Sequence, residues 1–139
     1  MRFRVVLLLV ALSHFAAAAQ VREYRLTHGE LKTQVIYGPM PEYPLEAQRR
    51  LFGGQGYDRL NVAHDGNVTA VKVIESAGNE ILDVACLNAF KRWRWKPGFR
   101  REIDLPVSFT FSRISGSYSP PTYVEAVKHR PAIVREFRD

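Results

Sequence analysis

Cysteine is scarce in this sequence, and its scarcity excludes several kinds of small fold. The 139 residues contain one cysteine, Cys86, so the chain has neither an intramolecular disulfide nor a multi-cysteine zinc knuckle. Internal repeats are absent, as are Gly/Ser-rich or Pro-rich stretches long enough to form a linker. We therefore expect one small domain with short appendages, held together by packing alone.

The longest apolar run is too short to cross a membrane. It begins at Val5, contains Ser13 and His14, and stops at Ala19, whereas a membrane-spanning helix needs about 20 predominantly apolar residues. Two arginines precede the run and four alanines close it, which is the pattern of a signal peptide. We expect cleavage near Ala19 and a periplasmic location. An uncleaved segment would instead anchor the chain in the inner membrane, facing the periplasm.

A strong excess of charge is also missing. The formal net charge is +6, and loss of Arg2 and Arg4 with the signal peptide would lower it to +4. Basic residues gather between Lys91 and Arg101 and near the C-terminus, where solvated faces are favoured over contact with an anionic membrane or partner. Neither nucleic acid nor a small-molecule substrate is an expected partner.

No group of residues has the spacing of a catalytic or metal site. His28, His64 and His129 are scattered, and neither a Ser/His/Asp nor a Cys/His set can be assembled. Cys86 lies on an apolar helical face, where a buried small side chain is favoured over a reactive thiol. The sequence therefore predicts no enzyme activity, no metal and no cofactor.

The first part of the patterned region predicts a helix followed by a hairpin. Pro44 suits a first helical turn and Gly53-Gly54 suits a stop, so a helix is expected over about residues 44–52. Two short period-two segments then flank Asp65-Gly66, which is typical of a hairpin turn. The first of these strands is expected to start late, near Arg59, because Gly56 and Asp58 break the apolar pattern. A further short strand is an option over residues 34–37.

The second part predicts a helix and a final strand. Apolar residues from Leu82 to Trp93 fall on one helical face, which favours a helix from Glu80 to Trp95 with Asn79 as its cap. Packing of Trp93 and Trp95 on the sheet is favoured over a binding platform. Residues 103–111 alternate apolar and polar side chains, and the proline at 106 makes this strand an edge or a bulge.

Together these patterns divide the chain into four parts. Residues 1–19 are the signal peptide, 20–40 an N-terminal extension, 41–112 the domain and 113–139 a loosely structured tail, with a short helix over 123–128 as an alternative. The fold class is α+β. The expected order of elements is helix, strand, strand, helix, strand.

Several motifs within residues 41–112 resemble the C-terminal domain of TonB energy-transducing proteins. They occur in the family's order and spacing: Pro-x-Tyr-Pro-x-x-Ala from Pro41, Gly54, Asp65-Gly66, Val-x-Val-x-x-Ser from Val71, Leu-Asp-x-Ala from Leu82, Trp-Arg-Trp-x-Pro from Trp93, and Pro-Val-x-Phe from Pro106. The resemblance implies a three-stranded antiparallel sheet packed by two helices. It also implies that the last strand is an open edge.

Family members use that edge to bind the TonB-box segment of outer-membrane TonB-dependent receptors by strand addition, in energy-coupled transport. An edge strand offers the unpaired main-chain groups that such β-augmentation requires. The resemblance thus implies a receptor, or a similar envelope protein, as partner. The partner-binding residues implied are Ile103, Asp104, Leu105, Val107, Ser108, Phe109, Thr110 and Phe111 in the edge strand, and Glu42, Tyr43 and Pro44 in the Tyr-Pro segment.

The N-terminal part departs from the family pattern. In the family a Ser and a His lie four residues apart on one face of the anchor helix, whereas Ser13 and His14 are adjacent and point about 100° apart on a helix. Only the short stretch 20–40 stands in place of the family's long Pro-rich spacer. The alternative hypothesis is therefore a stand-alone envelope domain that is structural, or self-associates as a homodimer through the same edge, with no role in transport.

Overall fold

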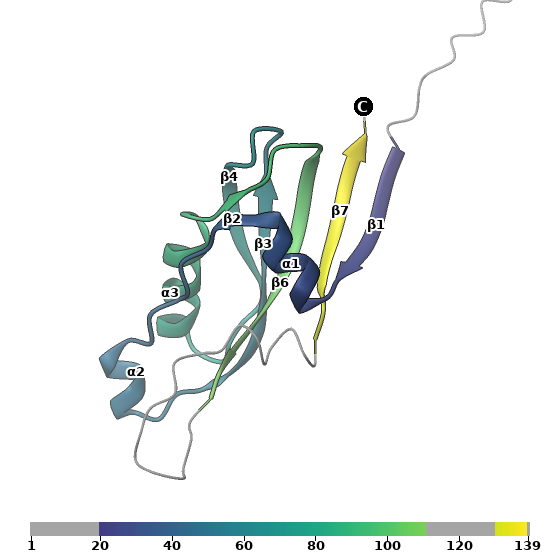
Figure 1. Ribbon diagram of the computed structural model, residues 1–139. Helices are drawn as coiled ribbons and strands as arrows, with labels where there is room; N and C mark the ends of the chain where they lie inside the picture. The colour runs from purple at the N-terminus through teal and green to yellow at the C-terminus, as the bar shows by residue number, and fades with distance from the viewer. Residues whose placement is uncertain (1–19, 111–129, 139) are drawn as a thin grey trace, which may run out of the picture.

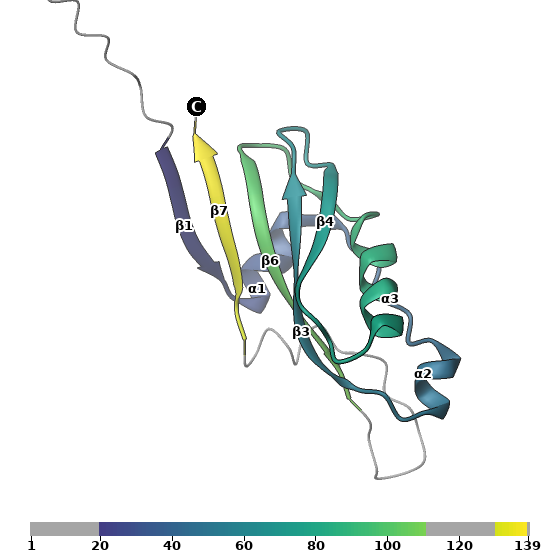
Figure 2. The same cartoon turned by 180° about the vertical axis from the view of Figure 1, so that it is seen from behind.

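The computed structural model describes residues 20–110 and 130–138. Their strands form an antiparallel five-stranded sheet of order β1-β7-β6-β3-β4, and a small sheet that pairs β2 with β5. Figures 1 and 2 show β1 and β7 side by side at one edge of the large sheet and β4 at the other. In chain order the elements are β1 (Gln20–Leu26), α1 (His28–Gln34), β2 (Val35–Tyr37), α2 (Leu45–Arg49), β3 (Gly54–Val62), β4 (Val68–Glu75), α3 (Glu80–Phe90), β5 (Arg94–Trp95), β6 (Arg100–Phe109) and β7 (Ala132–Arg138).

The two faces of the large sheet differ in chemistry. Leu60, Ile103 and Val134 lie opposite one another on neighbouring strands, and they share a buried cluster with Leu82 of α3 and Leu31 of α1. The helices therefore cover this face. Side chains alternate along each strand, so the residues between these project from the other face, where arginines and carboxylates meet.

The predicted hairpin is confirmed, but its first strand starts earlier than expected. Gly66 has a φ of +87°, and the backbone N–H of Asn67 donates to Asp65 Oδ1 at 2.9 Å, which closes the turn. β3 begins at Gly54, so the expected start near Arg59 is wrong. A side chain at Gly56 would meet Glu75 O at 2.3 Å, so glycine serves here to let two backbones approach closely.

The helix over the sheet is confirmed, with an earlier end. Asn79 caps α3 by accepting from the N–H of Ile81 at 2.9 Å. The helix ends at Phe90, because the N–H of Trp95 pairs with Gly66 O at 2.9 Å and draws the chain into β5. Trp93 and Trp95 lie beyond the helix yet are buried, with ring centroids 5.8 Å apart. Their expected packing role is confirmed.

The remaining helices are short. Pro44 is the N-cap of α2, and the helix ends at Arg49, shortly before Leu51, whose φ is +55°. α1 carries a capping box in which Thr27 and Glu30 bond reciprocally. No helix within the described residues is long and apolar enough to cross a membrane.

The α+β class and the antiparallel sheet are confirmed, but the expected three strands and two helices are too few. β1 comes from the segment predicted to be an extension, and β7 comes from the end of the segment predicted to be a loose tail. Each is stabilised by the other, with Gln20 opposite Arg138 and Leu26 opposite Ala132. The alternative helix over 123–128 lies outside the described residues.

Candidate partner-binding edge

The predicted binding strand is β6, and its single proline indicates how its main chain is oriented. Pro106 lies opposite Tyr57 of β3 and has no N–H to donate. A strand accommodates proline where the nitrogen faces away from its hydrogen-bonded neighbour. We infer that the main-chain groups of the even-numbered residues of β6 face away from β3. The β3–β6 register is continuous from Gly54 to Val62, so this parity holds along the whole strand.

The first half of that outer edge is already paired. β7 lies against residues 100–104, with Ile103 opposite Val134 and Asp104 opposite Ile133. The expectation that Ile103 and Asp104 lie on an open edge is therefore wrong, because β7, a strand from the far end of the chain, pairs with this half of β6. β6 is an inner strand of the sheet over this half.

The second half of β6 pairs on one side only among the described residues. Residues 105–109 lie opposite residues 54–58 of β3, while β7 pairs no further than Asp104. Five residues of this half are buried as whole residues, main chain included: Leu105, Pro106, Val107, Ser108 and Phe109. Thr110 follows the strand and is exposed, and Phe111 lies outside the described residues.

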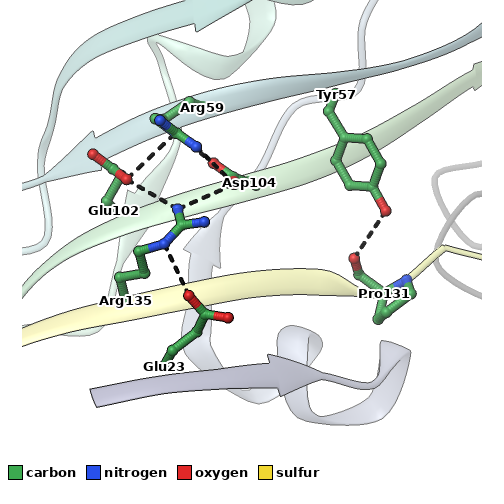
Figure 3. Close-up of polar contacts among 7 residues, drawn as sticks. All are labelled: Glu23, Tyr57, Arg59, Glu102, Asp104, Pro131 and Arg135. Atoms are coloured by element: carbon green, nitrogen blue, oxygen red, sulfur yellow. Dashed lines mark hydrogen bonds and ion pairs between the residues drawn. The ribbon is translucent and has the colours of Figure 1, made fainter. Parts of the chain in front are cut away.

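A charged network ties β7 and β1 to the inner strands (Figure 3). Arg59 of β3 donates to Asp104 through Nε at 2.7 Å and Nη2 at 3.0 Å. Arg135 of β7 donates from Nη1 to Asp104 at 3.1 Å and to Glu102 at 3.0 Å, and from Nε to Glu23 of β1 at 3.0 Å. The hydrogen bond with Asp104 raises the pKa of Arg59. Four strands are therefore linked by one set of ion pairs.

A second attachment holds the start of β7. Arg130 forms two hydrogen bonds with Glu75 of β4, at 3.1 and 2.6 Å, and its guanidinium lies 4.2 Å from the ring centre of Tyr57. The Tyr57 hydroxyl donates to Pro131 O at 3.3 Å (Figure 3). These contacts fix the point from which β7 runs along β6.

The Tyr-Pro segment lies beside the end of β6. The ring centres of Tyr43 and Phe109 are 5.4 Å apart, and the Tyr43 hydroxyl donates to Phe52 O. Glu42 is exposed and Pro44 is half-buried. All three residues line a groove of about 620 Å³, whose opposite wall is the outer face of α3. The structure thus brings the Tyr-Pro segment and the second half of β6 to the same end of the molecule.

Asp58 is a buried carboxyl group on the helix side of β3. It is 2% exposed, and burial raises its pKa to about 7. The Cys86 thiol hydrogen-bonds with it, while Asp58 Oδ1 has no hydrogen-bond partner within the described part of the chain. Cys86 is itself buried, which confirms the expectation of a small packed side chain, and burial likewise raises the pKa of its thiol.

Sequence reasoning missed the network residues Arg59, Glu102 and Arg135. Their types are ordinary for a solvated strand face, and they meet only because strands distant in sequence become neighbours. The β-branched and aromatic residues of 132–138, Ile133, Val134 and Phe137, are a weak strand signal that could have indicated β7.

Sequence comparisons with known proteins point to one family. A family model described as Gram-negative bacterial TonB protein C-terminal matches residues 39–113, more than half of the chain. The chain is 34% identical over 80 residues to Protein tonB2 of Pseudomonas aeruginosa, and 32% identical over 72 residues to Protein TonB of Escherichia coli K12. These matches cover 53% and 48% of this chain, but only 30% of each relative's length. The chain belongs to the TonB C-terminal domain family.

Proposed function

We propose that this chain is a periplasmic, non-enzymatic binding module that takes up an extended segment of an outer-membrane TonB-dependent receptor as an additional strand. The added strand would lie against the second half of β6, along Leu105, Val107, Ser108 and Phe109, and continue past Thr110 and Phe111. The observation that carries the proposal is the end of the β6–β7 pairing at Asp104. β6 continues for five residues beyond it, with β3 on one side.

Recognition at such an edge is mainly by the main chain. If the even-numbered residues of β6 face outward, Ser108 offers an N–H and a C=O to the partner, while Pro106 offers only its C=O. Pro106 thus removes one donor from the middle of the edge. A bound segment would pair best towards Ser108 and Thr110.

The Tyr-Pro segment would contact the residues that flank the added strand. Tyr43 packs on Phe109 at the end of β6, and the groove beside it is lined by Glu42 and Pro44. On the far wall the groove has the partly exposed side chains Ile81 and Val84 of α3. Its mixed apolar and acidic lining suits a short segment with apolar and basic side chains.

The role in energy-coupled transport is part of the proposal and rests on sequence similarity to TonB proteins. The relatives are named TonB proteins, and this chain corresponds to less than one third of their length. We infer that it supplies the receptor-binding part of such a system. Whether transport depends on this chain is tested by deleting its gene and measuring uptake of the substrates of TonB-dependent receptors.

Titration of a fluorescent TonB-box peptide against the purified chain tests the binding edge. The parent is expected to bind at micromolar concentrations, and Ser108→Pro to abolish binding while keeping the parent's circular dichroism spectrum. Ser108→Ala is the matched control, because it changes the side chain and keeps the N–H, and it should bind like the parent. Absence of binding by the parent at high micromolar concentration, or equal binding by the proline variant, would contradict the proposal.

The location is tested by the intact mass of the exported chain. A mature N-terminus at or near Gln20, where β1 begins, supports a free periplasmic protein. A chain that retains Met1 and sediments with membranes would show the anchored alternative instead.

A further inference from the structure

The two outer edges of the large sheet are protected to different degrees. β4, at one edge, carries Lys72 near its middle, and its register with β3 shifts twice. Next to its first residue, Asn67 forms an isolated bridge with Arg94. Lysine side chains, bulges and covered ends are the devices that keep an edge strand from pairing with another chain. The β4 edge is therefore poorly suited to recruit a further strand.

The β1 edge has neither a lysine nor a register shift, and its three charged side chains, Arg22, Glu23 and Arg25, are of both signs. The seven residues from Gln20 to Leu26 contain no proline, glycine or lysine, and they pair with β7 in an unbroken register. Gln20, Arg22, Glu23 and Arg25 are exposed, and Val21 is 54% exposed. Among the described residues no strand pairs with the outer side of β1. A regular strand of this length is a template for strand addition.

The alternating direction of the main-chain groups, inferred for β6 from Pro106, can be followed through β7 to β1. The even-numbered residues of β6 face β7, where Asp104 lies opposite Ile133 and Glu102 opposite Arg135. The odd-numbered residues of β7 therefore face β6 and its even-numbered residues face β1, since main-chain direction alternates along a strand. By the same alternation, the even-numbered residues of β1 face β7, so the main-chain groups of Val21, Glu23 and Arg25 face outward.

A second copy of β1 complements this edge in one antiparallel register. With a two-fold axis at Tyr24, Glu23 of each copy lies opposite Arg25 of the other, and the two Tyr24 side chains form a cross-strand aromatic pair. Centring the axis on Arg22, Glu23 or Arg25 would place that residue opposite its own copy, where like charges repel. The register at Tyr24 also aligns outward-facing residues with one another, as an antiparallel ladder requires.

We propose that the chain forms a weak, symmetric dimer in which two copies of β1 pair antiparallel about Tyr24, joining two five-stranded sheets into one continuous sheet. The dimer interface lies on β1, which is separated from the receptor-binding half of β6 by β7. The inference is therefore independent of the proposed receptor binding. A single pair of short strands buries less surface than a standard interface, so association is expected to be weak and reversible.

Sedimentation equilibrium of the mature chain, between about 10 µM and about 1 mM, tests the dimer. The parent is expected to shift from monomer to dimer across this range. Arg25→Glu should weaken association at least tenfold, since it places a glutamate opposite Glu23 at two sites. Lys72→Glu is the matched control: it makes the same charge change on β4, at the opposite edge of the sheet. It should dimerise nearly as well as the parent.

Mixing two variants tests the register directly. Glu23→Arg and Arg25→Glu should each be monomeric when alone, because each sets like charges opposite one another. Their equimolar mixture should form a heterodimer, since every facing pair is then of opposite charge. Circular dichroism melting first establishes that both variants stay folded, because Glu23 also contacts Arg135.

Three results would overturn the proposal. They are a parent that stays monomeric up to about 1 mM, equal weakening by Arg25→Glu and Lys72→Glu, and a mixture of two folded variants that does not associate.

Discussion

Arg135 of β7 donates from Nη1 to Asp104 of β6 at 3.1 Å, and so joins a strand from the chain's end to the strand expected to be an open edge. Asp104 is 4% exposed and also accepts from Arg59, so this carboxylate is enclosed by two guanidinium groups. Replacement of Arg135 by Met should cost about 1 to 2 kcal/mol of unfolding free energy, because Asp104 retains one partner and the side chain is partly solvated.

Hydrogen exchange identifies the part of the sheet that Arg135 holds. Amides of β1 and β7 should exchange faster in Arg135→Met, while those of β3 and β4 should stay protected. Arg138→Met provides the control, since Arg138 is ion-paired only with Glu136 of the same strand among the described residues, at 3.5 Å. Uniform loss of protection over the whole sheet would contradict this assignment.

Trp93 should be among the costliest side chains to truncate. It is 2% exposed, packs edge-on against Phe90 at 5.3 Å between ring centres, and donates from Nε1 to Pro39 O at 2.9 Å. Trp93→Ala should lower the free energy of unfolding by about 3 to 5 kcal/mol, measured by urea denaturation. Val84→Ala, at a position 46% exposed, should change it by less than about 1 kcal/mol. Equal midpoints would show that Trp93 does not support the core.

Gly56 should not tolerate a side chain. A Cβ there would meet Glu75 O at 2.3 Å and Ala77 N at 2.8 Å, and both are backbone atoms that cannot move aside cheaply. Gly56→Ala should therefore destabilise the domain by roughly 1 to 3 kcal/mol. Gly98→Ala is the comparison, since a Cβ at Gly98 meets nothing within 4 Å. A thermal melt of both variants beside the parent decides between them, and similar melting temperatures would refute the close approach of β3 and β4.

Asp58 should make stability depend on pH. Its folded pKa of about 7 lies above the unfolded value near 3.8, so the folded state binds the proton more tightly. The stability contributed by the protonated carboxyl is present below about pH 4 and is lost as the pH rises to about 7. Asp58→Asn should therefore be more stable than the parent at pH 8 by roughly 1 to 3 kcal/mol, with the difference vanishing near pH 4.

Asp65 supplies a control of opposite sign. Hydrogen bonds from Asn67 lower the pKa of this exposed carboxyl, so its stabilising effect is present at neutral pH and lost in acid. Asp65→Asn should be less stable than the parent at pH 8. Urea denaturation of the parent and both variants at pH 4, 6 and 8 separates the two cases. A constant difference between Asp58→Asn and the parent at all three pH values would exclude titration of Asp58 as the cause.

The parts of the fold that sequence predicts are those whose signals are local. The Asp65-Gly66 turn, the Asn79 cap and the apolar face of α3 each depend on residues close together in the chain, and each is confirmed. β1 and β7 pair across more than a hundred residues, and neither has an apolar alternation strong enough to indicate a strand alone. Pairing of this kind depends on tertiary context rather than on local propensity.

The candidate site divides in the same way. The alternation over residues 103–111 predicts one strand, and the structure confirms it as far as Phe109 but starts it earlier, at Arg100, and leaves Thr110 outside it. The covering of Ile103 and Asp104 depends on β7 and could not be inferred from that strand. The proximity of Tyr43 to Phe109 likewise arises from the folded arrangement of segments far apart in sequence.

The direct pairing of Gln20 with Arg138 has a mechanical consequence. Opposing loads applied at these two residues would act on the same end of the β1–β7 ladder, so its hydrogen bonds would be stressed one after another. A load carried from Gln20 to a partner aligned along β6 would act along the strands and stress many hydrogen bonds together. The same fold would thus open readily when it is pulled at Gln20 and Arg138. It would resist when the load passes from Gln20 to a strand bound along β6.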